Sequence, residues 1–264
     1  MLVFPQLSTG GAALYPVVRR SGKRSVVNAL ADGRTVIYGD AEGGVREWEL
    51  RAKGLTGDEW AAIEALFGAV RGRLSTFTFL DPAGNLLAHS EDFSDPVWTN
   101  GAALQMTPGQ TDPVGTTRAT RVVNSSGTGQ GIVQILAVPG NYQYSMSVWA
   151  RTDAGSSVNL TASAGTANAS LTVALDSQWR RVSLFSALGQ SAASVSFGVQ
   201  LGAGASVHLF GMQAEAQLAP SDYKKTGSGS GAIRARFSTD ELRVRAQGTD
   251  VFDSDITIVE AGGV

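Results

Sequence analysis

Few side chains in this chain are of types that carry out catalysis or hold metal ions. Its 264 residues include no Cys and two His, His89 and His208. Without Cys, disulfides, thiolate zinc sites and thiol nucleophiles are excluded. Neither His lies near a Gly-x-Ser-x-Gly turn, so no Ser–His–acid triad is indicated, and both are interpreted as surface or hinge residues. We therefore predict no catalytic residue, no metal site and no cofactor, although a calcium site built from oxygen ligands would leave no clear spacing.

Two pairs of adjacent carboxylates are of the residue type that hydrolyses glycosides, Glu91–Asp92 and Asp240–Glu241. Adjacent residues of a strand point to opposite faces, and both pairs occur in turn-like sequence, so we interpret them as solvated turns. The Gly-rich stretch 127–131 lacks the Lys and the strand-to-helix setting of a phosphate-binding loop, which indicates a hairpin turn. The chain is therefore not predicted to be an enzyme.

Aromatic side chains are the first candidates for ligand binding. Trp149 ends a strand-like run whose alternation places it on a polar face. The residues sharing that face are Gln143, Ser145 and Ser147. Such a Trp can stack on a sugar ring while its polar neighbours bond the hydroxyls, or it can equally be covered by a loop. Trp98 and Trp179 lie next to turns; they are further glycan-binding candidates, although an end plug of a sandwich is the favoured interpretation for both.

A basic cluster surrounds Ser21-Gly22, where we expect a hairpin tip. It consists of Arg19, Arg20, Lys23 and Arg24. The tip either contacts an acidic partner surface or nucleic acid, or it is a solvated hairpin whose charges discourage edge aggregation. Because 21 basic and 23 acidic residues give the whole chain a net charge of −2, a protein partner is favoured over nucleic acid.

The elements that position these residues are mostly short strands. The chain is 43% hydrophobic and 17% charged and has 32 Gly, which suits a globular protein with tight turns. Early strands are predicted at 14–20, 25–30, 34–38 and 45–51, and another at 75–80. Between them, Thr56 and Glu59 form a capping box that predicts one helix, which ends near Gly72. Its apolar stripe consists of Trp60, Ile63, Leu66, Phe67 and Val70.

The middle of the chain reads as a module made only of strands. Eight runs with a period of two are predicted as strands: 118–124, 130–137, 142–150, 157–163, 168–175, 180–186, 193–201 and 205–213. Their spacing favours two packed antiparallel sheets, as in a jelly-roll sandwich.

The ends of this module define the predicted domains. Residues 226–231 read as a flexible linker, and the short runs 232–237, 242–246 and 256–260 are predicted to return to the N-terminal part. We therefore expect one mainly β domain from 1–87 and 226–264, with a sandwich inserted at 88–225. No export signal and no long apolar segment is present, so we expect a soluble chain without membrane insertion.

Two resemblances cover most of the chain. The first part resembles the tube-like domain of distal tail proteins of long-tailed phages, in Phe4-Pro5-Gln6-Leu7, Arg46-x-Trp48-x-Leu50, Leu55-Thr56-x-x-Glu59 and Gly72-x-x-x-x-Phe77-x-Phe79-x-Asp81-Pro82. The closing motifs Arg236-Phe237-Ser238-Thr239-Asp240-Glu241-Leu242 and Ile256-x-Ile258-Val259-Glu260 also resemble the way such proteins end. The middle resembles sandwich modules of phage tail and fibre proteins, often regarded as carbohydrate-binding. It does so in Leu86-Leu87-x-x-Ser90-Glu91-Asp92-Phe93-Ser94-x-x-x-Trp98, Tyr144-Ser145-x-Ser147-Val148-Trp149-Ala150-Arg151, Phe210-Gly211-Met212-Gln213-Ala214-Glu215 and Pro220-Ser221-Asp222-Tyr223.

The resemblance implies a structural virion protein of the tail tip or baseplate, made in the host cytoplasm. Such proteins form a sixfold ring that joins the tail tube protein to the tail-tip hub protein, and DNA passes through the lumen without specific binding. Ring closure is a head-to-tail interface, and the basic cluster 19–24 is then expected to contact a neighbouring subunit or the tube. An outward sandwich can engage host surface polysaccharide by avidity. Gene transfer agents and other tail-like particles would use the same part.

Two other functions stay open. A free carbohydrate-binding or adhesin module, with the N-terminal domain as a small anchor, predicts a monomer with measurable glycan affinity. The tail interpretation predicts subunit rings even where glycan binding is undetectable. A glycan hydrolase is the third and least favoured function.

Overall fold

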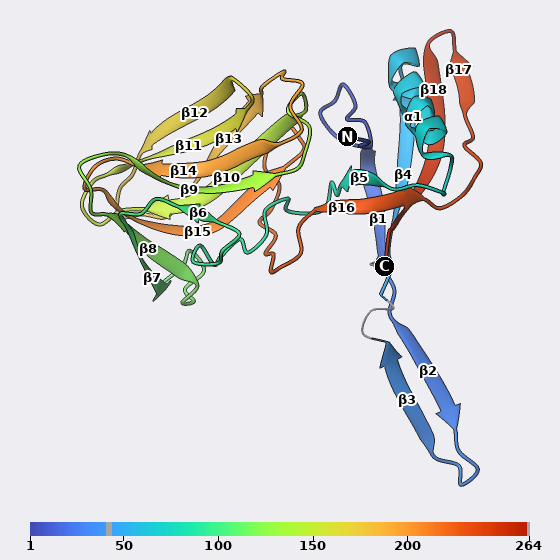
Figure 1. The fold of residues 1–264 in the computed structure, drawn as a ribbon, viewed down its shortest axis with the longest axis horizontal. Coiled ribbons are helices and arrows are strands. Elements are labelled where there is room, and N and C mark those ends of the chain that lie inside the picture. The colour runs from blue at the N-terminus through green and yellow to red at the C-terminus, as the bar shows by residue number, and fades with distance from the viewer. Residues whose placement is uncertain (41–43, 263–264) are drawn as a thin grey trace. The chain divides into compact units, whose positions relative to one another are not determined.

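The computed structural model describes residues 1–40 and 44–262, which fall into two compact units. The larger unit takes in Leu80–Ala232 together with Ser8–Ala12, and the smaller unit takes in Leu2–Leu7, Ala13–Phe79 and the chain from Ile233 onward. Figure 1 shows both units to consist mainly of strands, with one helix among the described residues. The predicted mainly β fold is confirmed. No helix within the described ranges has the length and apolar character needed to cross a membrane.

The larger unit is an antiparallel sandwich of two five-stranded sheets. One sheet has the order β13-β10-β15-β8-β7, and the other has the order β12-β11-β14-β9-β6. In chain order the strands are β6 (Thr99–Asn100), β7 (Leu104–Gln110), β8 (Ala119–Asn124), β9 (Gln130–Leu136), β10 (Gln143–Arg151), β11 (Ser157–Ala164), β12 (Ala167–Ala174), β13 (Arg180–Ala187), β14 (Val195–Leu201) and β15 (Ser206–Glu215). The predicted jelly-roll-like sandwich is thus confirmed.

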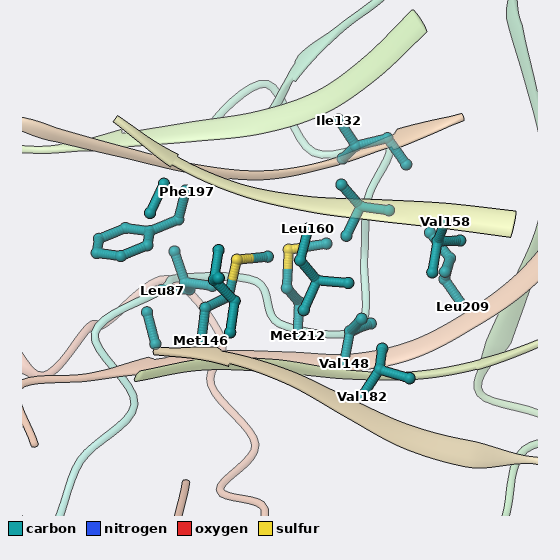
Figure 2. Packing of buried hydrophobic residues seen from close by; sticks show 14 of the residues in the cluster. Leu87, Ile132, Met146, Val148, Val158, Leu160, Val182, Phe197, Leu209 and Met212 are labelled. Atoms are coloured by element: carbon teal, nitrogen blue, oxygen red, sulfur yellow. The ribbon is translucent and has the colours of Figure 1, made fainter. Parts of the chain in front are cut away.

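Alternation along the strands builds the core between these sheets. In β10, Met146 and Val148 are at most 1% exposed and face Leu160 of β11 and Phe197 of β14 (Figure 2). Burial of each such side chain contributes roughly 1.5–3 kcal/mol. This core fixes which side chains of the β10 sheet point outward.

The eight predicted strands of the sandwich are all present, but two edge strands were missed. β6 has two residues, too few for a periodic pattern. β7 contains Pro108 and Gly109, and its pairing with β8 shifts register between Thr107 and Gln110. Pro and Gly lower strand propensity, and both are tolerated at an edge with an irregular register.

The boundaries of the sandwich lie outside the predicted 88–225. Leu80, Leu86 and Leu87 are at most 3% exposed and belong to its core. The Gly-Ser stretch 226–231 is not a free linker, because Thr226 Oγ1 donates to the carbonyl oxygen of Leu87 at 2.6 Å and Gly231 N donates to that of Asn85 at 2.7 Å. These bonds hold the two ends of the sandwich together.

The smaller unit has a six-stranded sheet with the order β1-β4-β18-β16-β5, in which β17 also pairs with β18. Its strands are β1 (Leu14–Ser21), β4 (Arg46–Leu55), β5 (Phe77–Leu80), β16 (Ala232–Phe237), β17 (Arg245–Gly248) and β18 (Val251–Glu260). The predicted capping box is confirmed at the start of α1 (Gly57–Val70), and Arg71, in the left-handed region with φ 56°, caps its end just before Gly72. Ile63, Leu66 and Val70 form the buried face of α1.

The expected hairpin tip at Ser21-Gly22 is wrong. β1 pairs with β4, whereas β2 (Arg24–Ala29) pairs with β3 (Thr35–Asp40), as a separate two-stranded ribbon in Figure 1. The turn is at Leu30–Arg34, where Leu30 N donates to the Arg34 carbonyl oxygen and Gly33 takes φ 81°. The chain reversal is therefore provided by the Gly33 turn. The basic cluster of Arg19, Arg20, Lys23 and Arg24 lies instead at the junction between the β1–β4 pair and the β2–β3 pair.

Candidate functional site

Trp149 projects from the outer face of the β10 sheet. Its neighbours Val148 and Ala150 are fully buried in the core, so the alternation of the strand turns Trp149 outward, where it is half-buried. Arg181 of β13 and Phe210 of β15 lie opposite Trp149 in the two adjacent strands. The polar face expected from the sequence is therefore built from three strands of one sheet.

One part of this outer face is closed by the chain itself. Residues 216–225 follow β15 and are here called the strap. On the same outer face, Ser145, Ser147 and Glu215 are no more than 2% exposed. Lys224 Nζ of the strap lies 2.7 Å from a carboxylate oxygen of Glu215. The ring of Tyr223 packs 5.3 Å from that of Phe210. A ligand on this face is thus restricted to the part that the strap leaves open.

Arg181 marks the boundary of the open part. Its Nη2 donates to Ser147 Oγ at 3.0 Å, and its buried Nε has no hydrogen-bond partner among residues 1–40 and 44–262. Burial lowers the pKa of the Arg181 guanidinium, and the negative charges of Glu215 and Asp222 oppose that shift. Since a guanidinium stays protonated in proteins, Arg181 brings a positive charge next to Trp149.

A cluster around Trp179 occupies the open part. Trp179 precedes β13; the Arg151 guanidinium carbon lies 5.4 Å from its ring centroid, and the His208 ring meets it edge-on at 6.4 Å. Asp153 joins these residues, because one of its carboxylate oxygens bonds Arg151 Nη1 and the other lies 2.9 Å from His208 Nε2. We call Trp179, Arg151, Asp153 and His208 the Trp179 cluster.

The charge states within the Trp179 cluster follow from its contacts. The hydrogen bond from His208 holds the pKa of Asp153 below its usual value, and the charge of Arg151 acts in the same direction. Burial lowers the pKa of His208 despite its bond to Asp153. At neutral pH we therefore assign an ionised Asp153 and a neutral His208. In this assignment the Nε2–H of His208 donates a hydrogen bond to the Asp153 carboxylate. The carboxylate keeps 62% of its side-chain surface exposed.

These groups have the chemistry of a sugar subsite. A half-buried indole offers an apolar face, an exposed carboxylate accepts from hydroxyls, and guanidinium groups donate to ring and hydroxyl oxygens. Arg151 follows Trp149 by two residues on one strand, so alternation alone could have identified it. Asp153 and His208 were not singled out for binding, since their approach depends on strand pairing.

Trp98 does not belong to this site. It is 4% exposed and packs edge-on against Phe93 at 5.6 Å. Its Nε1 donates to the carbonyl oxygen of His89 at 3.1 Å. Burial leaves no ring face for a sugar, so Trp98 is a core plug, and we remove it from the glycan-binding candidates.

Residues 89–95 include the carboxylate pair Glu91–Asp92 and His89, which the sequence predicts to be turn and hinge residues. Glu91 is not a solvated turn residue, because its side chain is 8% exposed and pairs with Arg118 at 3.0 Å and with Lys225 at 2.7 Å. His89, Asp92 and Asp95 place one ligand atom each within 4.8 Å of one another. Three such groups fall short of the six to eight oxygens that calcium takes.

The basic cluster 19–24 is partly neutralised within the smaller unit. Arg20 lies 2.7 Å from a carboxylate oxygen of Glu49 and 3.6 Å from one of Glu47. The four side chains come from β1, β2 and the residues between them, and all are exposed. Their contact with another subunit stays a prediction.

Comparisons with known proteins do not assign a family. No protein-family model and no curated protein matches the sequence. Among solved structures, the chain is similar to the CBM22-1 xylan-binding domain of Paenibacillus barcinonensis Xyn10C (14% identity, TM-score 0.40, 52% of this chain and 96% of that one). It is also similar to TmCBM61 in complex with β-1,4-galactotriose (15% identity, TM-score 0.40, 49% of this chain and 97% of that one).

A third similar structure is the enzymatically active domain of tailspike protein 4 from bacteriophage CBA120. Here the identity is 8% and the TM-score 0.41, over 52% of this chain and 22% of the tailspike chain. This chain thus spans less than a quarter of that protein. TM-scores this low leave the function to be argued from the site itself.

Proposed function

We propose that the sandwich is a non-catalytic glycan-binding module of a phage-type tail protein. The observation that carries the glycan-binding part is the Trp179 cluster, in which an indole, an ionised carboxylate and a guanidinium share the open part of one sheet face. Trp149 and Arg181 extend this surface along the same face.

The geometry favours stacking of a pyranose ring on an indole. The C–H groups of the sugar contact the aromatic face, while Asp153 accepts from a hydroxyl and Arg151 donates to one. The contacts of Arg151 and His208 with the Trp179 ring and with Asp153 fix the cluster before binding, which reduces the entropy that a ligand must overcome. A single shallow subsite of this kind binds weakly, so several copies acting together would supply the affinity.

The test is binding of the full chain to an array of surface polysaccharides and oligosaccharides, followed by titration of each hit. We expect Trp179→Ala to weaken binding about tenfold or more, a loss of about 1.4 kcal/mol. Ile135→Ala is the matched control, because Ile135 is 65% exposed on the other sheet. Unchanged affinity in Trp179→Ala, or no binding to any array member, would contradict the glycan-binding proposal.

For the tail role, we propose a homo-oligomeric ring, with sixfold symmetry, that joins a tail tube protein to a tail-tip hub protein in the virion. Besides the sequence resemblance, the β2–β3 ribbon supports a partner surface. Val26 lies opposite Tyr38 and Val27 opposite Ile37, and these side chains are 46–65% exposed. A lone two-stranded ribbon is marginally stable in water. Apolar pairs on both of its faces favour burial against another subunit.

Imaging by negative stain with mass determination tests the ring. The double substitution Val27→Lys and Ile37→Glu replaces an apolar cross-strand pair with an oppositely charged pair, so the two strands still attract each other. Because it removes apolar surface from the ribbon, we expect it to abolish ring formation by the intact chain. Leu171→Glu, at an exposed apolar position of the sandwich, is the control. A monomer that binds glycan would favour the free adhesin module, with the smaller unit as its anchor.

A further inference from the structure

The strand register places Arg121 beside the Trp179 cluster on the open face. In β10, Arg151 lies opposite His208 of β15, and His208 in turn lies opposite Arg121 of β8. Residues directly opposite one another in antiparallel strands share a face of the sheet. Arg121 therefore projects on the same side as Trp149 and the Trp179 cluster, and its neighbour Val122 is fully buried in the core.

Arg121 has no partner within the sandwich. Its side chain is exposed, and no hydrogen bond or ion pair joins it to any residue in the ranges that the structure describes. Asp153 is already engaged by Arg151 and His208. An unpaired guanidinium opposite His208 of the Trp179 cluster is available to a ligand.

The charges around this face favour a negatively charged ligand. Arg121, Arg151 and Arg181 lie on this face in three strands of one sheet, and of the three only Arg151 is paired with Asp153 among the described residues. Glu215 and Asp222 also act on Arg181, but Glu215 is 2% exposed and held by Lys224. Asp222 is exposed and offsets part of the Arg181 charge. The guanidinium groups of Arg121, Arg151 and Arg181 still exceed the carboxylates of Asp153 and Asp222 on this face, although the whole chain has a net charge of −2.

We propose that the Trp179 cluster takes an acidic glycan, with a sugar ring on Trp179 and the carboxylate of a uronic acid residue on Arg121. This inference rests on the proposed glycan-binding function and narrows its ligand class. The planar fork of a guanidinium matches a carboxylate with two parallel hydrogen bonds, which a neutral hydroxyl does not supply. Arg121 thereby becomes a determinant of ligand specificity rather than of stability.

The experiment uses matched probes on the full chain. Oligogalacturonates are compared with their methyl esters, which keep the ring and lose the charge, and with neutral galacto- and xylo-oligosaccharides. We expect the acid to bind about tenfold more tightly than its ester, with an affinity that falls as salt rises. Teichoic acid fragments form a separate arm, and binding of these phosphates in place of uronates would overturn the assignment of the carboxylate.

Variants separate the charge from the stacking platform. Arg121→Gln should remove the preference for the acid over the ester, and Arg121→Lys should restore only part of it because Lys lacks the fork. Arg180→Gln is the matched control, since Arg180 lies opposite the core-facing Ala150 and so belongs to the other side of the sheet. This control should leave the preference unchanged.

The outcomes distinguish this inference from the function on which it rests. Binding that depends on Trp179 but shows no preference for acid over ester overturns the acidic-glycan inference and leaves glycan binding intact. Failure of every probe to bind overturns both. A preference that survives in Arg121→Gln overturns the assignment of Arg121.

Discussion

His208 and Asp153 share a hydrogen bond at the edge of the proposed site, and both have lowered pKa values for different reasons. Burial disfavours the charged form of His208, so its pKa lies below the usual 6.5. The hydrogen bond from His208 favours the charged form of Asp153 and lowers its pKa. Near neutral pH the pair is therefore held together by an ionised acceptor and a neutral donor, with Arg151 beside both.

This assignment predicts how stability depends on pH. Because the unfolded chain binds a proton on His208 more readily than the folded chain does, the free energy of unfolding falls as the pH drops below about 6.5. Replacing His208 with Gln removes this titration, so the decrease between about pH 6.5 and pH 5 should shrink. Urea unfolding at several pH values checks it, and parallel profiles for both proteins would contradict the assignment.

The residue scale also shows what could be foreseen for the site. The alternation along 142–150 correctly predicted that Trp149 points away from the core, on the face opposite to Val148. The Trp179 cluster depends on the pairing of β10 with β15, which sets Arg151 opposite His208. No local pattern encodes that register. Trp98 has the same sequence setting as Trp179, next to a turn, and only packing distinguishes the buried plug from the half-buried platform.

At the scale of elements, the strands were easier to predict than their partners. The eight periodic runs of the sandwich became β8 to β15, since each must bury alternate side chains. The run of β1 was also present, but Ser21-Gly22 imitates a turn, and the true partner of β1 is β4. Strand pairing is decided by long-range packing, which neither Gly nor periodicity reports.

The strap provides a prediction at this scale. Gly211 has φ 64°, and a Cβ placed on it would lie 3.0 Å from the Tyr223 ring of the strap. Gly204 has φ 67° with nothing within 4 Å. Both Ala variants incur the left-handed backbone penalty of about 1–2 kcal/mol. Gly211→Ala should lower the free energy of unfolding further than Gly204→Ala, because it also displaces Tyr223. Equal losses in urea unfolding would show that the strap does not press on Gly211.

At the scale of the whole molecule, the core of the sandwich is built from one continuous segment of the chain. Its core residues all come from the segment between Leu80 and Ala232. The segment's ends are joined by bonds between the backbones of Asp81 and Gly231, at 2.8 Å, and of Gly231 and Asn85, at 2.7 Å. Residues 8–12 also belong to this unit, with Gly10 close to Leu218 of the strap.

We therefore expect the excised segment 80–232 to fold cooperatively and to keep the glycan affinity of a single copy. Loss of residues 8–12 further exposes Leu218, which is already 50% exposed, but removes no member of the core cluster, so the segment should be only slightly less stable than the sandwich in the full chain. Near-ultraviolet circular dichroism and urea unfolding measure this, with the full chain as reference. A segment that keeps its strands but lacks fixed aromatic packing would show that the smaller unit is needed to complete the sandwich.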